Sequence, residues 1–127
     1  MKKNNIIFNL IMVVGILFLS ISTTYANEIC PTAMDSLKLE QVKQRINSND
    51  FDEAKLKIIK SALDKNCLTA VQLKEILSLL SFEEDKINII KLGFKKLTDP
   101  TNIEVVLSVL EFDSSKKEVN DFIATGK

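Results

Sequence analysis

The chain of 127 residues contains no histidine, only two cysteines and two prolines, and three glycines. Histidine is the commonest general base and a frequent metal ligand, so its absence excludes a Ser-His-Asp triad and the HExxH zinc motif. The GxSxG motif of serine hydrolases and the glycine-rich phosphate-binding loops are also absent. We therefore expect a protein that is not an enzyme and that has no catalytic, cofactor-binding or metal-binding residues.

Carboxylates are grouped at two places, in the segments 50–53 and 83–85. In principle a pair of carboxylates can hydrolyse a glycosidic bond. Acids at the start of a helix are explained more simply by their attraction to its positive end. The segment NSNDFDE (47–53) is weakly similar to a calcium-binding loop, but it lacks the turn glycine and the later bidentate glutamate. We favour a structural role for both groups.

Positive charge is scarce once the first 26 residues are set aside. The remainder has 15 basic and 17 acidic residues, and Arg45 is its single arginine. Nucleic acids and anionic membrane surfaces attract basic proteins, and arginine is the preferred residue for bidentate phosphate contacts. We therefore expect no nucleic-acid partner.

The N-terminus has the pattern of a signal peptide. Lys2 and Lys3 precede the apolar run IIFNLIMVVGILFLSIS, which ends near the small residues Thr24 and Ala26. This pattern predicts a signal peptide at 1–26 and a single domain at 27–127. The alternative is a retained membrane anchor, but the run is short for a spanning helix of about 20 residues. We expect no membrane span after cleavage, and a periplasmic or secreted location.

The two cysteines, Cys30 and Cys67, lie in the part predicted to be exported. In an oxidising compartment two cysteines most simply form one disulfide bond. Two free thiols or an intermolecular bond are the alternatives. Two positions so far apart can form neither a CxxC redox motif nor a metal site.

Apolar residues recur at helical spacing throughout the predicted domain, and no stretch alternates as a strand would. The pattern predicts an all-α fold of about six short helices. Thr69 and Gln72 form the capping-box pattern of one helix start, and Asp99-Pro100 marks another. Asn66 is expected to end a helix in the left-handed conformation.

A motif of phenylalanine, an acid, two variable residues and lysine occurs three times. Its copies are FDEAK (51–55), FEEDK (82–86) and FDSSK (112–116), which begin 31 and 30 residues apart. The segment ILSLLSFEEDK (76–86) aligns without a gap on VLSVLEFDSSK (106–116). We predict stacked helical hairpins, as two and a half repeats of about 31 residues, with one motif at each corner.

Each residue type of the motif is expected to have a structural role at its corner. The phenylalanine can pack on the fourth residue of the new helix as a hydrophobic staple. The acid can cap the new helix. The lysine can cover the phenylalanine ring and donate to the last carbonyls of the preceding helix, or pair with the acid. These nine corner residues are Phe51, Asp52, Lys55, Phe82, Glu83, Lys86, Phe112, Asp113 and Lys116.

Two further expectations follow from the motif. Lys117 replaces the apolar staple partner in the third copy, so the third corner is expected to fray first. The alternative to a structural role is that the three lysines form a row of ligand contacts, one in each repeat.

Several segments together match the pattern of a known family and cover nearly all of residues 30–123. They are Cys30, Met34, Phe51-Asp52 with Lys55-Leu56, NCLTAVQL (66–73), Phe82-Glu83 with Lys86, Asp99, Asn102, Phe112, Ser114 and Phe122-Ile123. The chain resembles the bacterial family called domain of unknown function 4476, often found behind an export signal. Phe94 stands where this family more often has tyrosine. The resemblance implies a small helical domain without assigned catalytic residues.

The sequence therefore predicts an exported, non-catalytic helical domain that acts through contacts with an unknown protein partner, as an adaptor, an inhibitor or an envelope component. The alternative is a small carrier of a lipid or another apolar ligand. The apolar runs 76–80 and 105–110 could line a groove for such a ligand, but helices covered on both sides explain them as core.

Overall fold

A computed structural model describes residues 30–126, whose regular structure is helical apart from two isolated β-bridges. The α-helices are α2 (Ser36–Asn47), α3 (Asp52–Lys65), α4 (Ala70–Leu77), α5 (Glu83–Gly93), α6 (Ile103–Leu107) and α7 (Asp113–Thr125). Two short 3-10 helices, η1 (Phe94–Lys96) and η2 (Pro100–Asn102), join α5 to α6. The all-α prediction is confirmed. The predicted signal peptide lies outside the described residues.

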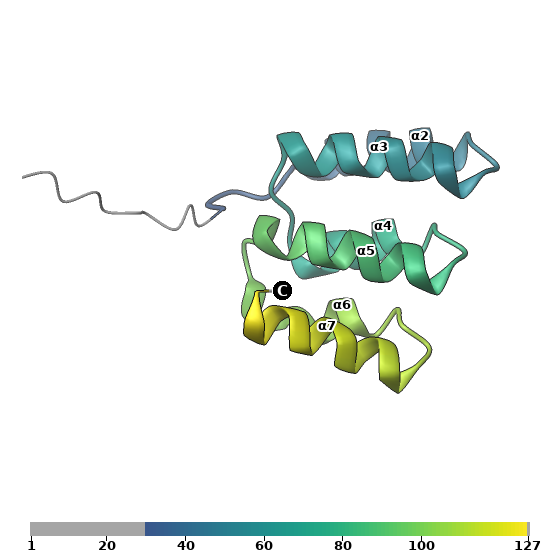
Figure 1. Cartoon of the computed structure of the whole chain (residues 1–127). Helices are drawn as coiled ribbons and strands as arrows, with labels where there is room; N and C mark the ends of the chain where they lie inside the picture. Colours follow the sequence, from purple (N-terminus) through teal and green to yellow (C-terminus); the bar gives the residue numbers. More distant parts are fainter. Residues whose placement is uncertain (1–29, 127) are drawn as a thin grey trace, which may run out of the picture.

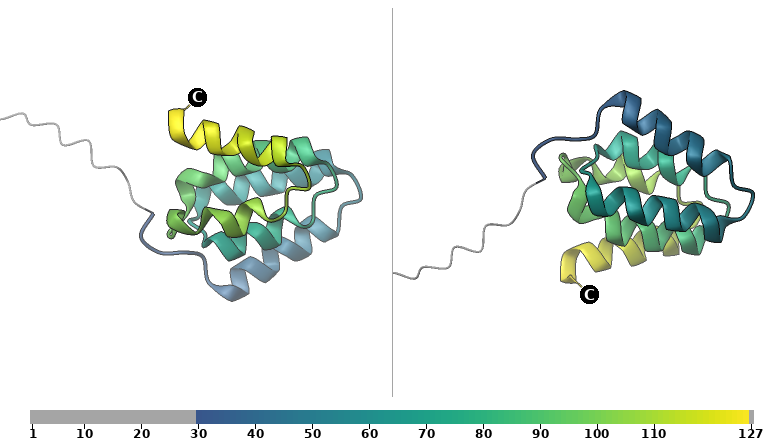
Figure 2. Two further views of the ribbon diagram at one scale, coloured as in Figure 1. Left: turned by 90° about the horizontal axis from the view of Figure 1, so that it is seen from below. Right: turned by 90° about the horizontal axis from the view of Figure 1, so that it is seen from above.

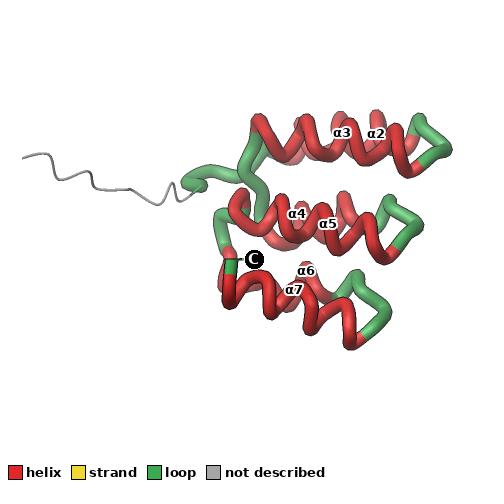
Figure 3. The backbone as a smooth tube through the Cα atoms, in the orientation of Figure 1, coloured by secondary structure: helices red, strands yellow, loops and turns green. Residues whose placement is uncertain are grey.

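The helices form three hairpins that lie one above another as layers (Figure 1). The layers are α2–α3, α4–α5 and α6–α7. The first layer contacts the second through α3 and α5. The second contacts the third through the pairs α4 with α6 and α5 with α7. The connections within the hairpins lie at one end of the molecule, and those between hairpins lie at the other (Figure 3). Views of the molecule from below and from above show the same grouping of the connections (Figure 2). The count of two and a half repeats remains a prediction from the sequence.

The middle layer forms the centre of the hydrophobic core. In α4 and α5 the side chains of Leu73, Ile76, Ile89 and Ile90 are fully buried. Gly93 lets the two helices approach closely, because an added Cβ would lie 3.1 Å from Cδ2 of Leu73. The apolar run that begins at Ile76 is therefore core, as the sequence analysis favoured. None of the described helices is long and apolar enough to cross a membrane.

Side chains at the start of α4 hold two layers together. Thr69 and Gln72 form the predicted capping box, with distances of 3.2 Å from Gln72 N to Thr69 Oγ1 and 3.0 Å from Thr69 N to Gln72 Oε1. The other amide atom of Gln72, Nε2, donates to Met34 O at 2.7 Å. Asp99 is the N-cap residue of η2 with Pro100 at its first position, as predicted, but its Oδ1 accepts from Ala70 N at 2.7 Å and not from its own helix. This carboxylate therefore caps the helix of the neighbouring layer.

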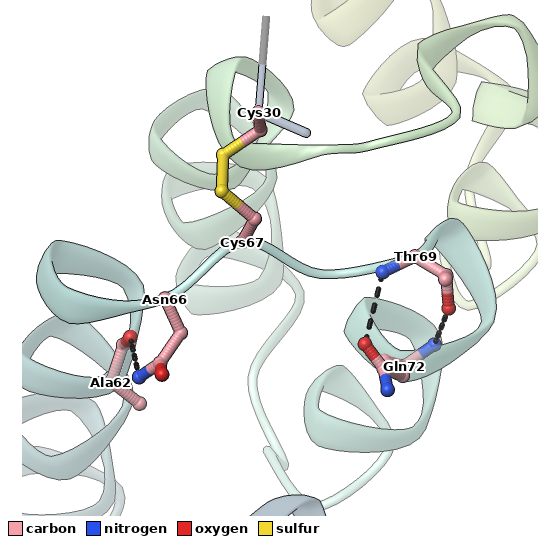
Figure 4. The surroundings of a disulfide bond; sticks show 6 residues. All are labelled: Cys30, Ala62, Asn66, Cys67, Thr69 and Gln72. Carbon is pink, nitrogen blue, oxygen red and sulfur yellow. Dashed lines mark hydrogen bonds between the residues drawn. A yellow bond between two sulfur atoms is a disulfide. The ribbon is translucent and has the colours of Figure 1, made fainter. Parts of the chain in front are cut away.

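The junctions between hairpins lie side by side as short extended segments. Leu68 pairs with Leu97 in a parallel β-bridge, and Met34 N donates to Cys67 O at 2.9 Å. Cys30 and Cys67 form a pair at disulfide distance, with Cα atoms 5.6 Å apart (Figure 4). The predicted cysteine pairing is therefore confirmed at the level of distance.

The expected left-handed conformation at Asn66 is wrong. Asn66 has φ −139° and ψ 151°, so the chain leaves α3 directly into the extended junction. Its Nδ2 donates to Ala62 O at 2.8 Å, and this bond satisfies a carbonyl at the helix end without a left-handed residue. Gly126 adopts the left-handed conformation after α7, with φ 70°.

Candidate functional site

Three phenylalanine side chains are exposed at equivalent places in the three layers. Phe51, Phe82 and Phe112 are the N-cap residues of α3, α5 and α7, with φ between −98° and −102° and ψ between 132° and 136°. Their exposed fractions are 79%, 64% and 58%. We call these three residues the phenylalanine row. These exposures do not support the predicted hydrophobic staple, since Phe112, the copy expected to lack a staple partner, is the least exposed of the three.

The row lies at the end of the molecule where the hairpins turn (Figure 3). We call the segments 47–55, 78–86 and 108–116 the first, second and third corners. Packed helices lie about 8–10 Å apart, so the row extends over about 16–20 Å along the stack. The corners are adjacent because hydrogen bonds join each to the next.

The acid of each motif was expected to cap its own helix, and the structure corrects this. Asp52 Oδ2 accepts hydrogen bonds from Ser81 N at 2.8 Å and from Phe82 N at 3.3 Å. Both donors belong to the second corner. The carboxylate therefore links the first layer to the second, while its position in the first turn of α3 also suits the positive end of that helix.

Glu83 repeats this link one layer further along. Its Oε1 accepts from Glu111 N at 2.9 Å and from Phe112 N at 3.2 Å, both in the third corner. Asp113, the third acid, is fully exposed, and its one ion pair among residues 30–126 is with Lys116 at 3.8 Å. The links therefore run from the first corner to the second and from the second to the third.

The three lysines of the motif have different surroundings. Lys55 is largely buried, donates from Nζ to Leu79 O at 3.0 Å and lies 3.6 Å from Asp52. The predicted acceptor was a carbonyl of the preceding helix, α2. Leu79 follows α4, so the observed carbonyl belongs to the next layer. Lys86 has neither an ion pair nor a side-chain hydrogen bond among residues 30–126.

All three rings of the row are more than half exposed, and no lysine ammonium among residues 30–126 lies over one of them. The one cation above a ring within the described part of the chain is Lys91, whose Nζ lies 5.6 Å from the centroid of Phe122. The predicted pairing of acid and lysine holds for Lys55 with Asp52 and for Lys116 with Asp113. These are i,i+3 pairs, worth about 0.2–0.5 kcal/mol each on a helix surface.

The corners concentrate negative charge around the phenylalanine row. Together the three segments hold eight acidic residues and three lysines, a net charge of −5. The other described residues hold 8 acidic and 11 basic residues, a net charge of +3. The acids of the corners are Asp50, Asp52, Glu53, Glu83, Glu84, Asp85, Glu111 and Asp113. The candidate site is thus a row of phenyl rings bordered by carboxylates.

Other charged groups contribute to packing between layers. Lys43 donates to Glu75 at 2.8 Å and to Glu40 at 2.9 Å, which joins α2 to α4. These hydrogen bonds raise the pKa of Lys43 above its usual value, whereas a lysine acting as a base or nucleophile needs a lowered pKa. Among residues 30–126, no group of three or more acidic or cysteine side chains is arranged to hold a metal ion.

Sequence reasoning located the corners but missed that their phenylalanines are exposed. The available signal was the residue type at the N-cap. Serine, threonine, aspartate and asparagine are strongly preferred there, and all three helices have phenylalanine instead. Phenylalanine cannot accept the capping hydrogen bond that those residue types form, so its presence at three N-caps indicates a role other than capping.

Comparison with known proteins identifies the family. Searches of the curated proteins and of the solved structures found no significant match. The family model called domain of unknown function (DUF4476) matches residues 33–123, a span that includes all three corners. The chain therefore belongs to the DUF4476 family.

Proposed function

We propose that this chain is an exported, non-catalytic domain that binds a protein partner through the phenylalanine row. The observation that carries the proposal is the exposure of three phenylalanines, by 58–79%, at the same position of three successive corners. Large apolar side chains grouped on a surface are typical of protein-binding sites. Aromatic residues are also enriched in protein interfaces, where they contribute much of the binding energy.

A structural role does not explain these residues. None of the three rings is buried in the core, and none supplies a capping hydrogen bond to its helix. Replacing a favourable N-cap residue by an apolar one typically costs about 0.5–2 kcal/mol. The chain accepts this unfavourable choice three times, which favours selection for binding over selection for stability.

The repetition of the site supports a partner that contacts several layers at once. One exposed ring gives little specificity, whereas three rings on a rigid stack can be contacted together by one surface. The hydrogen bonds of Asp52 and Glu83 fix each corner against the next. A preorganised surface of this kind loses little conformational freedom on binding.

Export is the second part of the proposal. It is supported by the basic and apolar N-terminal sequence and by the cysteine pair at disulfide distance, since disulfides persist mainly in oxidising compartments. The protein is expected to act in the periplasm or outside the cell. Sequencing the N-terminus of the protein recovered from the periplasm or the medium tests this part, and a mature chain that begins at Asn27 is the expected result.

The binding role is tested by crosslinking in the cells that make the protein. The full chain carrying a C-terminal tag is compared with the variant F51S/F82S/F112S and with the control L37S/V71S/L92S. The control removes three other large apolar side chains, exposed by 70%, 53% and 52%, that lie outside the corners. We expect the crosslinked partner to be lost in the first variant and kept in the control. Equal crosslinking by all three proteins would refute the proposal.

A further inference from the structure

We propose that the partner presents a cationic amphipathic segment that lies along the phenylalanine row. This inference rests on the proposed function and adds the chemistry of the partner. Apolar side chains of the segment would contact the rings, and its lysines or arginines would face the carboxylates beside them. Arginine and lysine also interact favourably with the faces of aromatic rings.

Charge separation within the molecule supports a cationic partner. The three corners carry a net charge of −5, whereas the rest of the described chain carries +3. The acidic charge is therefore gathered at the end that displays the phenylalanine row. Opposite charges across an interface favour encounter and exclude partners of the wrong sign. An anionic membrane or an acidic peptide would be repelled from this end.

Carboxylates next to the rings are free to receive such a partner. Asp50, Glu84 and Glu111 lie one or two residues from a ring of the row, one at each corner, and all three are exposed. Their side chains have neither hydrogen bonds nor ion pairs within residues 30–126. Asp113 is also fully exposed. Folding therefore leaves at least one unused carboxylate beside each phenylalanine.

The length of the row sets the length of the segment. Three layers at about 8–10 Å spacing extend over about 16–20 Å. A helix rises about 1.5 Å per residue, so a helical segment needs about 11–13 residues to contact all three rings. Its apolar residues must lie on one face, with the basic residues at the borders of that face.

The inference is tested with synthetic peptides on the protein purified from cells that express the full chain. One peptide is a dye-labelled amphipathic Lys/Leu helix of 14 residues, and the matched control has glutamate in place of every lysine. Fluorescence anisotropy should show that the Lys/Leu peptide binds at least tenfold more tightly than the glutamate control. Added salt should weaken the binding of the Lys/Leu peptide. Amide NMR shifts should change at the three corners. Equal affinity of the two peptides, or no binding of either, would overturn the inference.

Charge variants separate the contribution of the acids from that of the rings. We expect D50N/E84Q to weaken binding of the Lys/Leu peptide by about two- to thirtyfold, since exposed ion pairs contribute about 0.2–1 kcal/mol each. The matched control D64N/E104Q removes the same charge from exposed acids outside the corners, and should leave the affinity unchanged. If both double variants lost the same affinity, binding would depend on net charge alone, which would contradict a specific surface.

Two outcomes distinguish this inference from the proposed function. If F51S/F82S/F112S loses its crosslinked partner while the Glu/Leu peptide displaces that partner as well as the Lys/Leu peptide does, the proposed function stands and the cationic segment is wrong. If the variant keeps its partner, both the proposed function and the inference of a cationic segment are wrong. Sedimentation of the purified protein gives a third check. A dimer that the triple substitution abolishes would make a second copy of this chain the occupant and would overturn the inference.

Discussion

The first and third corners carry the same motif but use it in opposite ways. At the first corner, the Asp52 side chain is 8% exposed and accepts two amides of the next layer. The amides of Asp50 and Phe51 in that corner have no acceptor among the described residues. At the third corner the amides are bonded to Glu83, while Asp113 is fully exposed and links to no further layer. The acid is therefore a link between layers, directed along the chain.

This comparison separates the roles of the acid and the phenylalanine. The acid loses its linking role where the stack ends, because there is no following layer to supply the amides. The phenylalanine is exposed at all three corners, whether or not the neighbouring acid forms a link. Its exposure is thus independent of the links, which agrees with a role in binding.

The largest effect on stability is expected at the end of the molecule opposite the corners, where the cysteine pair joins the segment before α2 to the junction between α3 and α4. Replacing both residues, as in C30S/C67S, should lower the free energy of unfolding by about 2–5 kcal/mol, mainly through the greater freedom of the unfolded chain. Denaturant unfolding followed by circular dichroism measures the change. Because the corners are held separately, the relative amide exchange rates of the three corners should stay the same. A changed order would show that the two ends are coupled.

Removing the first acid should have the next largest effect. Asp52→Ala deletes the acceptor of two amides and should lower the free energy of unfolding by about 1–2 kcal/mol. Asp113→Ala removes the same group where it forms no link, and should cost no more than the loss of favourable charge at the helix start, about 0.3–1 kcal/mol. Hydrogen exchange should accelerate at Ser81 and Phe82 in the first variant only. Equal costs would mean that the link is not what distinguishes these corners.

A smaller effect on the free energy of unfolding is expected from substitutions of two lysines of the motif. Lys55→Met keeps the apolar stem and removes the hydrogen bond to Leu79 O, so we expect a loss of about 0.5–1.5 kcal/mol. Lys86→Met removes no contact of the charged group, and its effect should lie within about 0.5 kcal/mol of zero. Chemical denaturation of both variants provides the measurement. If Lys86→Met is the more destabilising variant, the assigned contacts of these lysines are wrong.

The structure also changes the basis for predicting which corner opens first. The expectation that the third corner frays first rested on its missing staple, yet Phe112 is the least exposed ring of the row. The amides of the third corner are held by Glu83, whereas those of the first corner have no such acceptor. On this basis the amides of Asp50 and Phe51 should exchange faster than those of Glu111 and Phe112. Slower exchange at the first corner would contradict the assigned links.

Local features of the fold could be predicted from the sequence because they depend on neighbouring residues. The helical spacing and the capping box of Thr69 and Gln72 are of this kind, and both are observed. The roles of Asp52, Glu83 and Asp99 could not be predicted, because each accepts from an amide that lies in another layer. A rule for one helix end assigns such an acid to its own helix. The correct partner is defined only when the hairpins are stacked.

The candidate site was missed for a related reason. Each phenylalanine of the motif was expected to pack on the helix that follows it as a hydrophobic staple. At these corners the rings are exposed, while Asp52, Lys55 and Glu83 form the contacts between layers. The first copy of the motif thus combines two contacts between layers with one exposed ring, and the sequence alone did not separate these roles.

The unfolding free energy of F51S/F82S/F112S tests the central claim most directly. Serine is a favourable N-cap residue, and the three rings contribute little to the core. If the phenylalanine row exists for binding, the variant should be as stable as the unchanged protein, or more stable by up to about 0.5–1 kcal/mol at each corner. A loss of more than about 2 kcal/mol would contradict the account, because it would mean that the rings stabilise the fold.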